Sequence, residues 1–214
     1  TGRATLPTDA AREAWAIVGR RGGKSRVAAL VAILLACLRD YRNVLAAGER
    51  GTVMVIAADR KQARVVFGYV RALLASVPTL AALVAAETKD SITLTTGIVI
   101  EIHTASFRAV RGYTVVGAVL DEIAFWPTDD SADPDTEILN ALRPAMATVP
   151  GALLLAISSP YARRGELWRA FDKHHGRDDD PVLVWQADTA TMNPGMVDSP
   201  VIAAAYDADP AAAS

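Results

Sequence analysis

Three short runs of this sequence are almost wholly apolar and rich in valine, leucine and isoleucine: residues 53–57, 115–120 and 153–157. A strand of that composition must be covered on both faces, as a central strand of a parallel sheet is. Segments with helical periodicity alternate with these runs, at about 24–38, 60–75, 135–147 and 164–175. The alternation predicts an α/β fold, a mostly parallel sheet with helices on both faces.

Further strands are predicted at 14–18, 92–95, 98–103 and 182–185. The sequence Thr95-Thr96-Gly97 lies between two of them and is typical of a hairpin turn. Part of the sheet, or an appendage to it, is therefore expected to be antiparallel.

Composition limits the class of protein. A chain of 214 residues with 51% apolar residues can bury the core of one domain. Its longest apolar run, 27–38, is too short to cross a bilayer as a helix. The single cysteine, Cys37, excludes an internal disulfide, and we expect a soluble protein of a reducing cytoplasm. The net charge of −2 means that any contact with nucleic acid would need a local basic patch.

A glycine-rich loop directly follows the first predicted strand. The segment 14–18 leads into Gly-Arg-Arg-Gly-Gly-Lys-Ser at 19–25 and then into a helix, the context in which such a loop binds phosphates. Backbone N–H groups and the helix N-terminus would hold the phosphates, Lys24 would neutralise charge, and Ser25 would ligate Mg²⁺. The first glycine, Gly19, is one residue later than the usual spacing requires, and a basic surface turn is the alternative interpretation. The predicted nucleotide-binding residues are Arg20, Arg21, Gly22, Gly23, Lys24 and Ser25.

The run 115–120 ends in two carboxylates, Asp121 and Glu122. This places them at the carboxyl edge of the sheet, where α/β proteins bind ligands. Asp121 is predicted to hold Mg²⁺ together with Ser25, and Glu122 to orient and polarise the water that attacks the γ-phosphate. A helix cap would explain the same pair without chemistry.

Two hydroxyls, Ser158 and Ser159, follow the run 153–157. In additional-strand P-loop ATPases a small polar side chain at this position senses the γ-phosphate. A plain Ser-Ser-Pro turn explains the same residues without function.

The ordered set GRRGGKS, RGYTVVGAVLDEIAFW and LLLAISSPY resembles the ATPase domain of large terminase subunits of tailed bacteriophages. The stretch WQADTATMNP is similar to the linker region of that family. The resemblance covers nearly the whole chain. It implies a P-loop NTPase of the additional-strand (ASCE, RecA-like) class, an ATP-driven motor that threads double-stranded DNA into a procapsid in the host cytoplasm. It also implies a homo-oligomeric ring at the portal protein, a small terminase partner, and no membrane.

The resemblance assigns roles to further residues. Arg20 would contact the nucleotide phosphates, Arg111 would act as an arginine finger on the neighbouring subunit's ATP, and Ser158 with Ser159 would couple hydrolysis to DNA movement. It implies an ATPase domain over 1–187 and a linker or peripheral segment over 188–214, with no nuclease domain and no nuclease activity. The family's adenine-reading glutamine upstream of the P-loop has no counterpart before Lys24.

Two other functions fit the motifs. A helicase-like ATPase also pairs a P-loop with an acidic strand end, although it normally needs a second motor domain. An assembly or regulatory module could bind ATP and turn it over slowly.

Overall fold

A computed structural model describes the chain except for residues 6, 107–109, 111, 128–132, 197–199 and 201–214. Its strands are β1 (Glu13–Val18), β2 (Gly51–Ala57), β3 (Val84–Glu87), β4 (Ser91–Leu94), β5 (Val99–Thr104), β6 (Thr114–Asp121), β7 (Leu153–Ser158) and β8 (Val182–Ala187). Its helices are α1 (Lys24–Cys37), α2 (Arg60–Ser76), α3 (Pro78–Ala81), α4 (Pro134–Ala147), α5 (Gly165–His174) and α6 (Thr189–Met192), with short 3-10 helices η2 (Ile123–Phe125) and η3 (Pro194–Met196).

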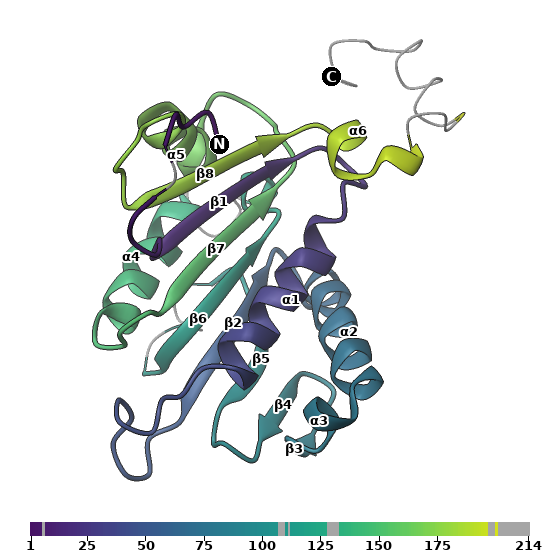
Figure 1. Ribbon diagram of the computed structural model, residues 1–214, viewed down its shortest axis with the longest axis vertical. Coiled ribbons are helices and arrows are strands. Elements are labelled where there is room, and N and C mark those ends of the chain that lie inside the picture. The colour runs from purple at the N-terminus through teal and green to yellow at the C-terminus, as the bar shows by residue number, and fades with distance from the viewer. Residues whose placement is uncertain (6, 107–109, 111, 128–132, 197–199, 201–214) are drawn as a thin grey trace.

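Across the described residues the strands form one eight-stranded sheet in the order β3-β4-β5-β2-β6-β7-β1-β8. All neighbours from β5 to β8 in this order are parallel, whereas β4 is antiparallel to both β3 and β5. Helices α1 and α2 lie on one face and α4 and α5 on the other (Figure 1). The predicted α/β architecture is confirmed. Strand β7 lies between β1 and β6, which is the inserted strand of the additional-strand class.

The central strands are buried on both faces because helices cover both. Residues 115–121 of β6 are all buried, and so is the whole of β2. At Gly117, a Cβ would lie 2.6 Å from Cδ1 of Leu35 in α1. No side chain fits there, so glycine lets α1 approach the sheet closely and sets the position of the helix that follows the glycine-rich loop.

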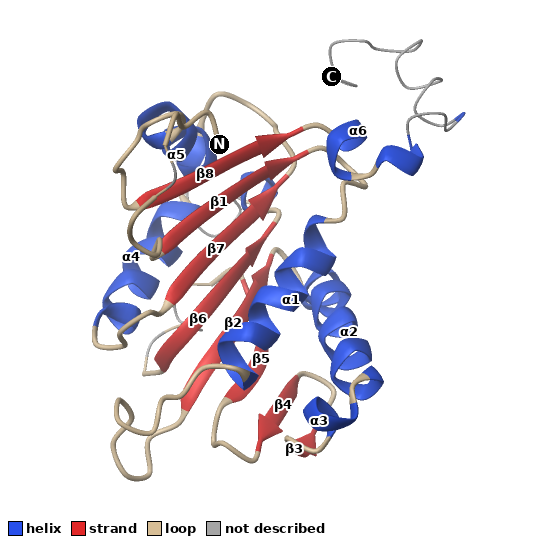
Figure 2. Cartoon of the chain, in the orientation of Figure 1, coloured by secondary structure: helices blue, strands red, loops and turns tan. Residues whose placement is uncertain are grey.

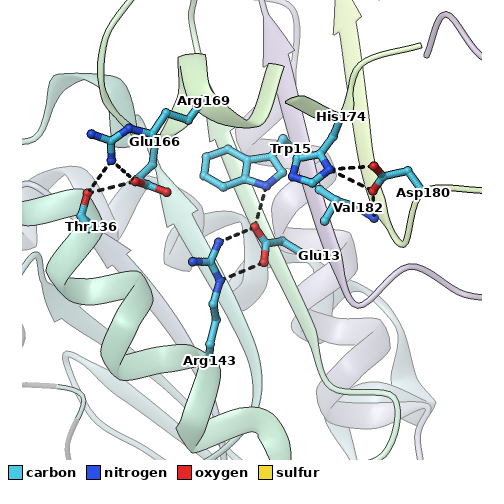
Figure 3. A network of polar contacts seen from close by, with 9 residues as sticks. All are labelled: Glu13, Trp15, Thr136, Arg143, Glu166, Arg169, His174, Asp180 and Val182. Atoms are coloured by element: carbon cyan, nitrogen blue, oxygen red, sulfur yellow. Dashed lines mark hydrogen bonds and ion pairs between the residues drawn. The ribbon is translucent and has the colours of Figure 1, made fainter. Parts of the chain in front are cut away.

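Polar contacts tie β1 to the helices on its α4 and α5 side (Figure 3). Arg143 of α4 forms an ion pair with Glu13 at 2.9 Å, and Glu13 also accepts a hydrogen bond from the indole N–H of buried Trp15 at 2.9 Å. Nearer the start of the same helix, Thr136 donates to Glu166 of α5 at 3.0 Å. These contacts hold the two helices against the sheet.

The predicted hairpin at 95–97 is confirmed, with Gly97 at φ +84° between antiparallel β4 and β5. Two elements were not predicted from the sequence, α3 and β3. Strand β3 is mostly exposed at the sheet edge, so its sequence lacks the apolar run of a buried strand. Within the described part of the chain, no helix is both long and apolar enough to cross a membrane.

Candidate active site

Three chain segments with predicted chemistry meet at one edge of the sheet. Strands β1, β7 and β6 are neighbours and parallel, so the residues that follow them lie side by side (Figure 2). The register pairs Ile17 with Ser158 and Asp121 with Ile157. The glycine-rich loop, the two serines and the acidic pair are therefore brought together.

The backbone of the loop at 19–24 explains its glycines. Gly22 donates its N–H to the carbonyl of Gly19 at 3.2 Å, and a Cβ at Gly22 would lie only 2.5 Å from Val18. Gly23 caps α1 with φ +78°, a left-handed conformation that glycine adopts without steric cost. The chain thus turns tightly from β1 into the N-terminus of α1, as phosphate binding requires.

Lys24, the first residue of α1, lies at the centre of the site. Its side chain is only 8% exposed, and Nζ lies 2.9 Å from Oε1 of Glu122 and 2.9 Å from Oγ of Ser159. One lysine therefore contacts the strand end of β6 and the strand end of β7 at once.

The carboxylate of Glu122 is held from several sides. It accepts hydrogen bonds from the backbone N–H of Ser159 at 2.9 Å and from Oγ of Ser158 at 3.2 Å, in addition to the Lys24 ion pair. Its backbone has φ 52° and ψ 45°, a left-handed conformation that costs a non-glycine residue about 1–2 kcal/mol. Backbone strain of this kind clusters at functional sites.

Asp121 is buried beside this cluster. Its Oδ1 atom has no hydrogen-bond partner among the described residues, and only 3% of the residue is exposed. Burial, with a smaller contribution from the negative charge of Glu122, raises the pKa of Asp121 to about 7, while Lys24 acts in the opposite direction. An uncompensated buried carboxylate oxygen is suited to a cation, and it fits an oxygen ligand of Mg²⁺ or of its water shell.

The structure therefore brings together Lys24, Asp121, Glu122, Ser158 and Ser159. Both serines are buried, and Ser158 donates to the carbonyl of Ser159 at 3.0 Å. Both are thus firmly placed beside the acidic pair.

The remaining predicted residues are placed differently. Ser25 lies in the first turn of α1 and is partly exposed, whereas the side chains of Arg20 and Arg21 are exposed on the loop. Arg21 has φ 61°. Arg111 lies outside the described residues.

Sequence reasoning missed one group of residues at the site. The segment after β8, predicted as peripheral, contacts the loop: Thr189 Oγ1 donates to the carbonyl of Arg20 at 2.7 Å, and Asn193 Nδ2 to the carbonyl of Arg21 at 3.1 Å. The only local signal was Asp188, whose side chain caps α6. The boundary at residue 187 stays a prediction, but residues beyond it fix the shape of the glycine-rich loop.

A cleft of about 420 Å³ opens beside the loop. It is lined by Gly19, by the end of β8 including Trp185 and Gln186, by Pro160, and by Thr191 of α6. Its volume falls in the range of small-ligand sites.

Known proteins share this fold. The chain superposes on the Thermus phage P74-26 large terminase ATPase domain with a TM-score of 0.66 and 17% identity, over 88% of this chain and 80% of that one. The large terminase of a thermophilic bacteriophage gives 0.64 and 14%, over 95% and 47%, and the HK97 bacteriophage large terminase gives 0.60 and 19%, over 81% and 35%. This chain thus spans less than half of each of these two longer terminases.

No family model and no curated protein matches the sequence. The predicted resemblance is confirmed at the level of three-dimensional structure, across most of the chain. This chain has the P-loop NTPase fold of the ATPase domains of large phage terminases.

Proposed function

We propose that this chain hydrolyses ATP as the motor domain of a phage DNA-packaging machine, driving double-stranded DNA into a procapsid. The observation that carries the proposal is the convergence of Lys24, Glu122 and Ser159, each pair joined by a contact of 2.9 Å. A P-loop lysine and an acidic strand end beside it are what phosphoryl transfer to water requires.

The geometry supports a division of labour within the site. Lys24 and the N–H groups of the glycine-rich loop bind the β- and γ-phosphates, so Lys24 exchanges Glu122 for phosphate oxygens. Glu122, released from this ion pair, accepts a proton from the attacking water. Ser158 and Ser159, which hold Glu122 by hydrogen bonds, hold the position that responds when the γ-phosphate is lost.

The residues present fit a magnesium ion. Asp121 offers a buried carboxylate oxygen without a partner among the described residues, and Ser25 lies in the first turn of the adjoining helix. Mg²⁺ held by these two residues supplies neutralisation of the charge on the β- and γ-phosphates.

The remaining parts of the proposal come from the resemblance. Arg20 contacts the phosphates, and Arg111 completes a neighbouring subunit's site in a ring. The ring works with the portal protein and a small terminase subunit in the host cytoplasm. Residues 1–187 form the ATPase domain, and residues 188–214 a linker or peripheral segment. No nuclease activity belongs to this stretch of chain.

The substitution Glu122→Gln tests the proposal. It keeps the size of the side chain but removes the proton acceptor, so ATP binding should remain while turnover falls about 100-fold or more. Binding is measured with a fluorescent ATP analogue and turnover by phosphate release. The control is Glu137→Gln on the exposed side of α4, which should hydrolyse ATP at the parental rate.

Turnover is measured over a range of protein concentrations, because a finger supplied in trans makes activity per molecule rise with concentration. Unchanged turnover in Glu122→Gln would remove this residue from the mechanism. A parental protein without Mg²⁺-dependent ATP hydrolysis at any concentration would refute the ATPase function.

A further inference from the structure

A group of exposed aromatic rings and arginines lies at the same sheet edge as the site. We call it the arginine–aromatic patch, and it consists of Phe125, Tyr161, Arg163, Arg164 and Trp168. The Phe125 and Tyr161 rings have centroids 4.7 Å apart, and 60% of Tyr161 is exposed. The guanidinium of Arg164 lies 5.6 Å from the Tyr161 ring, and that of Arg163 lies 5.3 Å from the Trp168 ring.

The two patch arginines are positioned by rings instead of carboxylates. The salt bridges within the described residues do not include Arg163 or Arg164, whereas nearby Arg169 is paired with Glu166. A guanidinium that packs its flat face on a ring keeps the N–H donors at its edge for another acceptor. The patch therefore presents two ordered positive charges with free donors, although the whole chain has a net charge of −2.

The patch is built on the two segments that hold the carboxylate of Glu122. Phe125 belongs to η2, and its N–H donates to the carbonyl of Glu122 at 2.9 Å. Tyr161 follows Ser159 by two residues, and the N–H of Ser159 donates to the Glu122 side chain at 2.9 Å. The Phe125–Tyr161 contact joins the two segments. A ligand that moves the patch would thus act on groups next to the γ-phosphate position.

The chemistry of the patch favours phosphate diesters. A planar guanidinium fork matches two phosphate oxygens, and arginines with free edges make the positioning contacts of protein–DNA interfaces. Two consecutive arginines on an exposed segment fit the regular spacing of charges along a strand. An acidic protein surface is a less specific match, because it lacks that regular spacing.

We infer that the arginine–aromatic patch binds the phosphate backbone of double-stranded DNA. The inference rests on the proposed function and adds to it the place where DNA contacts this domain. It differs from the basic residues of α2, because Arg60 and Arg64 are both paired with Asp90.

The double variant R163Q/R164Q tests the inference. Binding of a short fluorescent DNA duplex is followed by anisotropy between about 50 and about 200 mM NaCl, because each phosphate contact contributes about −0.9 to the slope of log K against log salt. Losing two contacts should weaken binding about 10-fold at low salt and make the slope shallower by about 1.8. The loss of affinity across this salt range should then be about 12-fold smaller than in the parental protein.

Two further variants separate charge from position. R12Q/R50Q makes the same change in net charge at exposed residues that precede β1 and β2, at the opposite edge of the sheet, and should bind the duplex as the parental protein does. R163K/R164K keeps the charge and should restore the salt slope. Circular dichroism confirms that each variant is folded.

The inference is overturned if R163Q/R164Q binds the duplex with unchanged affinity and slope. It is also overturned if the parental protein fails to bind the duplex at low salt, in which case the patch would fit an acidic protein surface. ATP hydrolysis without DNA is measured in parallel, and R163Q/R164Q should retain it. Loss of the proposed function would show instead as a parental protein without ATPase activity, so the two failures are distinct.

Discussion

Replacing Asp121 by asparagine should stabilise this protein in the absence of nucleotide and metal. Burial raises the pKa of Asp121 from 3.8 to about 7. The folded protein therefore holds this proton more tightly than the unfolded chain, and the free energy of unfolding falls as pH rises from about 4 to about 7. At about 1.4 kcal/mol per pKa unit, the ionised carboxylate costs about 1.5 kcal/mol at about pH 5 and about 4 kcal/mol at about pH 8.

Asparagine has no charge to desolvate, so Asp121→Asn should be more stable than the parental protein by up to these amounts. The assay is urea unfolding followed by circular dichroism at both pH values. Other carboxylates titrate in both proteins and largely cancel in the difference. The control, Asp172→Asn, changes an exposed residue of α5 and should give a difference independent of pH. If the Asp121→Asn difference changes by less than about 0.5 kcal/mol between the two pH values, the buried-charge reasoning is wrong.

Two further predictions concern contacts away from the acidic pair. Thr189→Val removes the hydroxyl that donates to a carbonyl of the glycine-rich loop, so nucleotide affinity should fall about 3- to 10-fold with little change in the melting temperature, and unchanged affinity in a titration would contradict this. Glu13→Ala leaves the buried indole N–H of Trp15 without its acceptor and breaks the ion pair with Arg143, so the free energy of unfolding should fall by about 2–3 kcal/mol. Asp40→Ala, which breaks an exposed ion pair, should cost less than about 1 kcal/mol in the same urea titration, and equal losses would refute the role of burial.

Much of the sheet follows from local sequence. The apolar runs predicted β2, β6 and β7 with errors of one or two residues, because strands buried on both faces tolerate few polar side chains. Strand β3 escaped because it is short and exposed, so neither periodicity nor burial marks it. The sequence Pro-Thr-Leu-Ala that precedes it forms the single turn α3, too short for a periodic signal.

The candidate site was predictable where each motif ends its own strand. Lys24 and Glu122 could be named because parallel strands place their carboxyl ends at one edge. The contacts of Thr189 and Asn193 with the loop could not, because they join residues far apart in sequence and depend on β8 lying next to β1. The stacking of Phe125 on Tyr161 likewise depends on the neighbouring positions of β6 and β7.

The ion pair between Lys24 and Glu122 has a consequence for an idle motor. Without a triphosphate, the two charges neutralise each other, so neither is stranded in a poorly hydrated site. While the lysine occupies it, the glutamate is a weaker base toward water. An incoming γ-phosphate competes for the lysine and thereby switches on the residue that will attack it through water. The substrate itself would arm the catalyst, and an unloaded subunit would stay chemically silent.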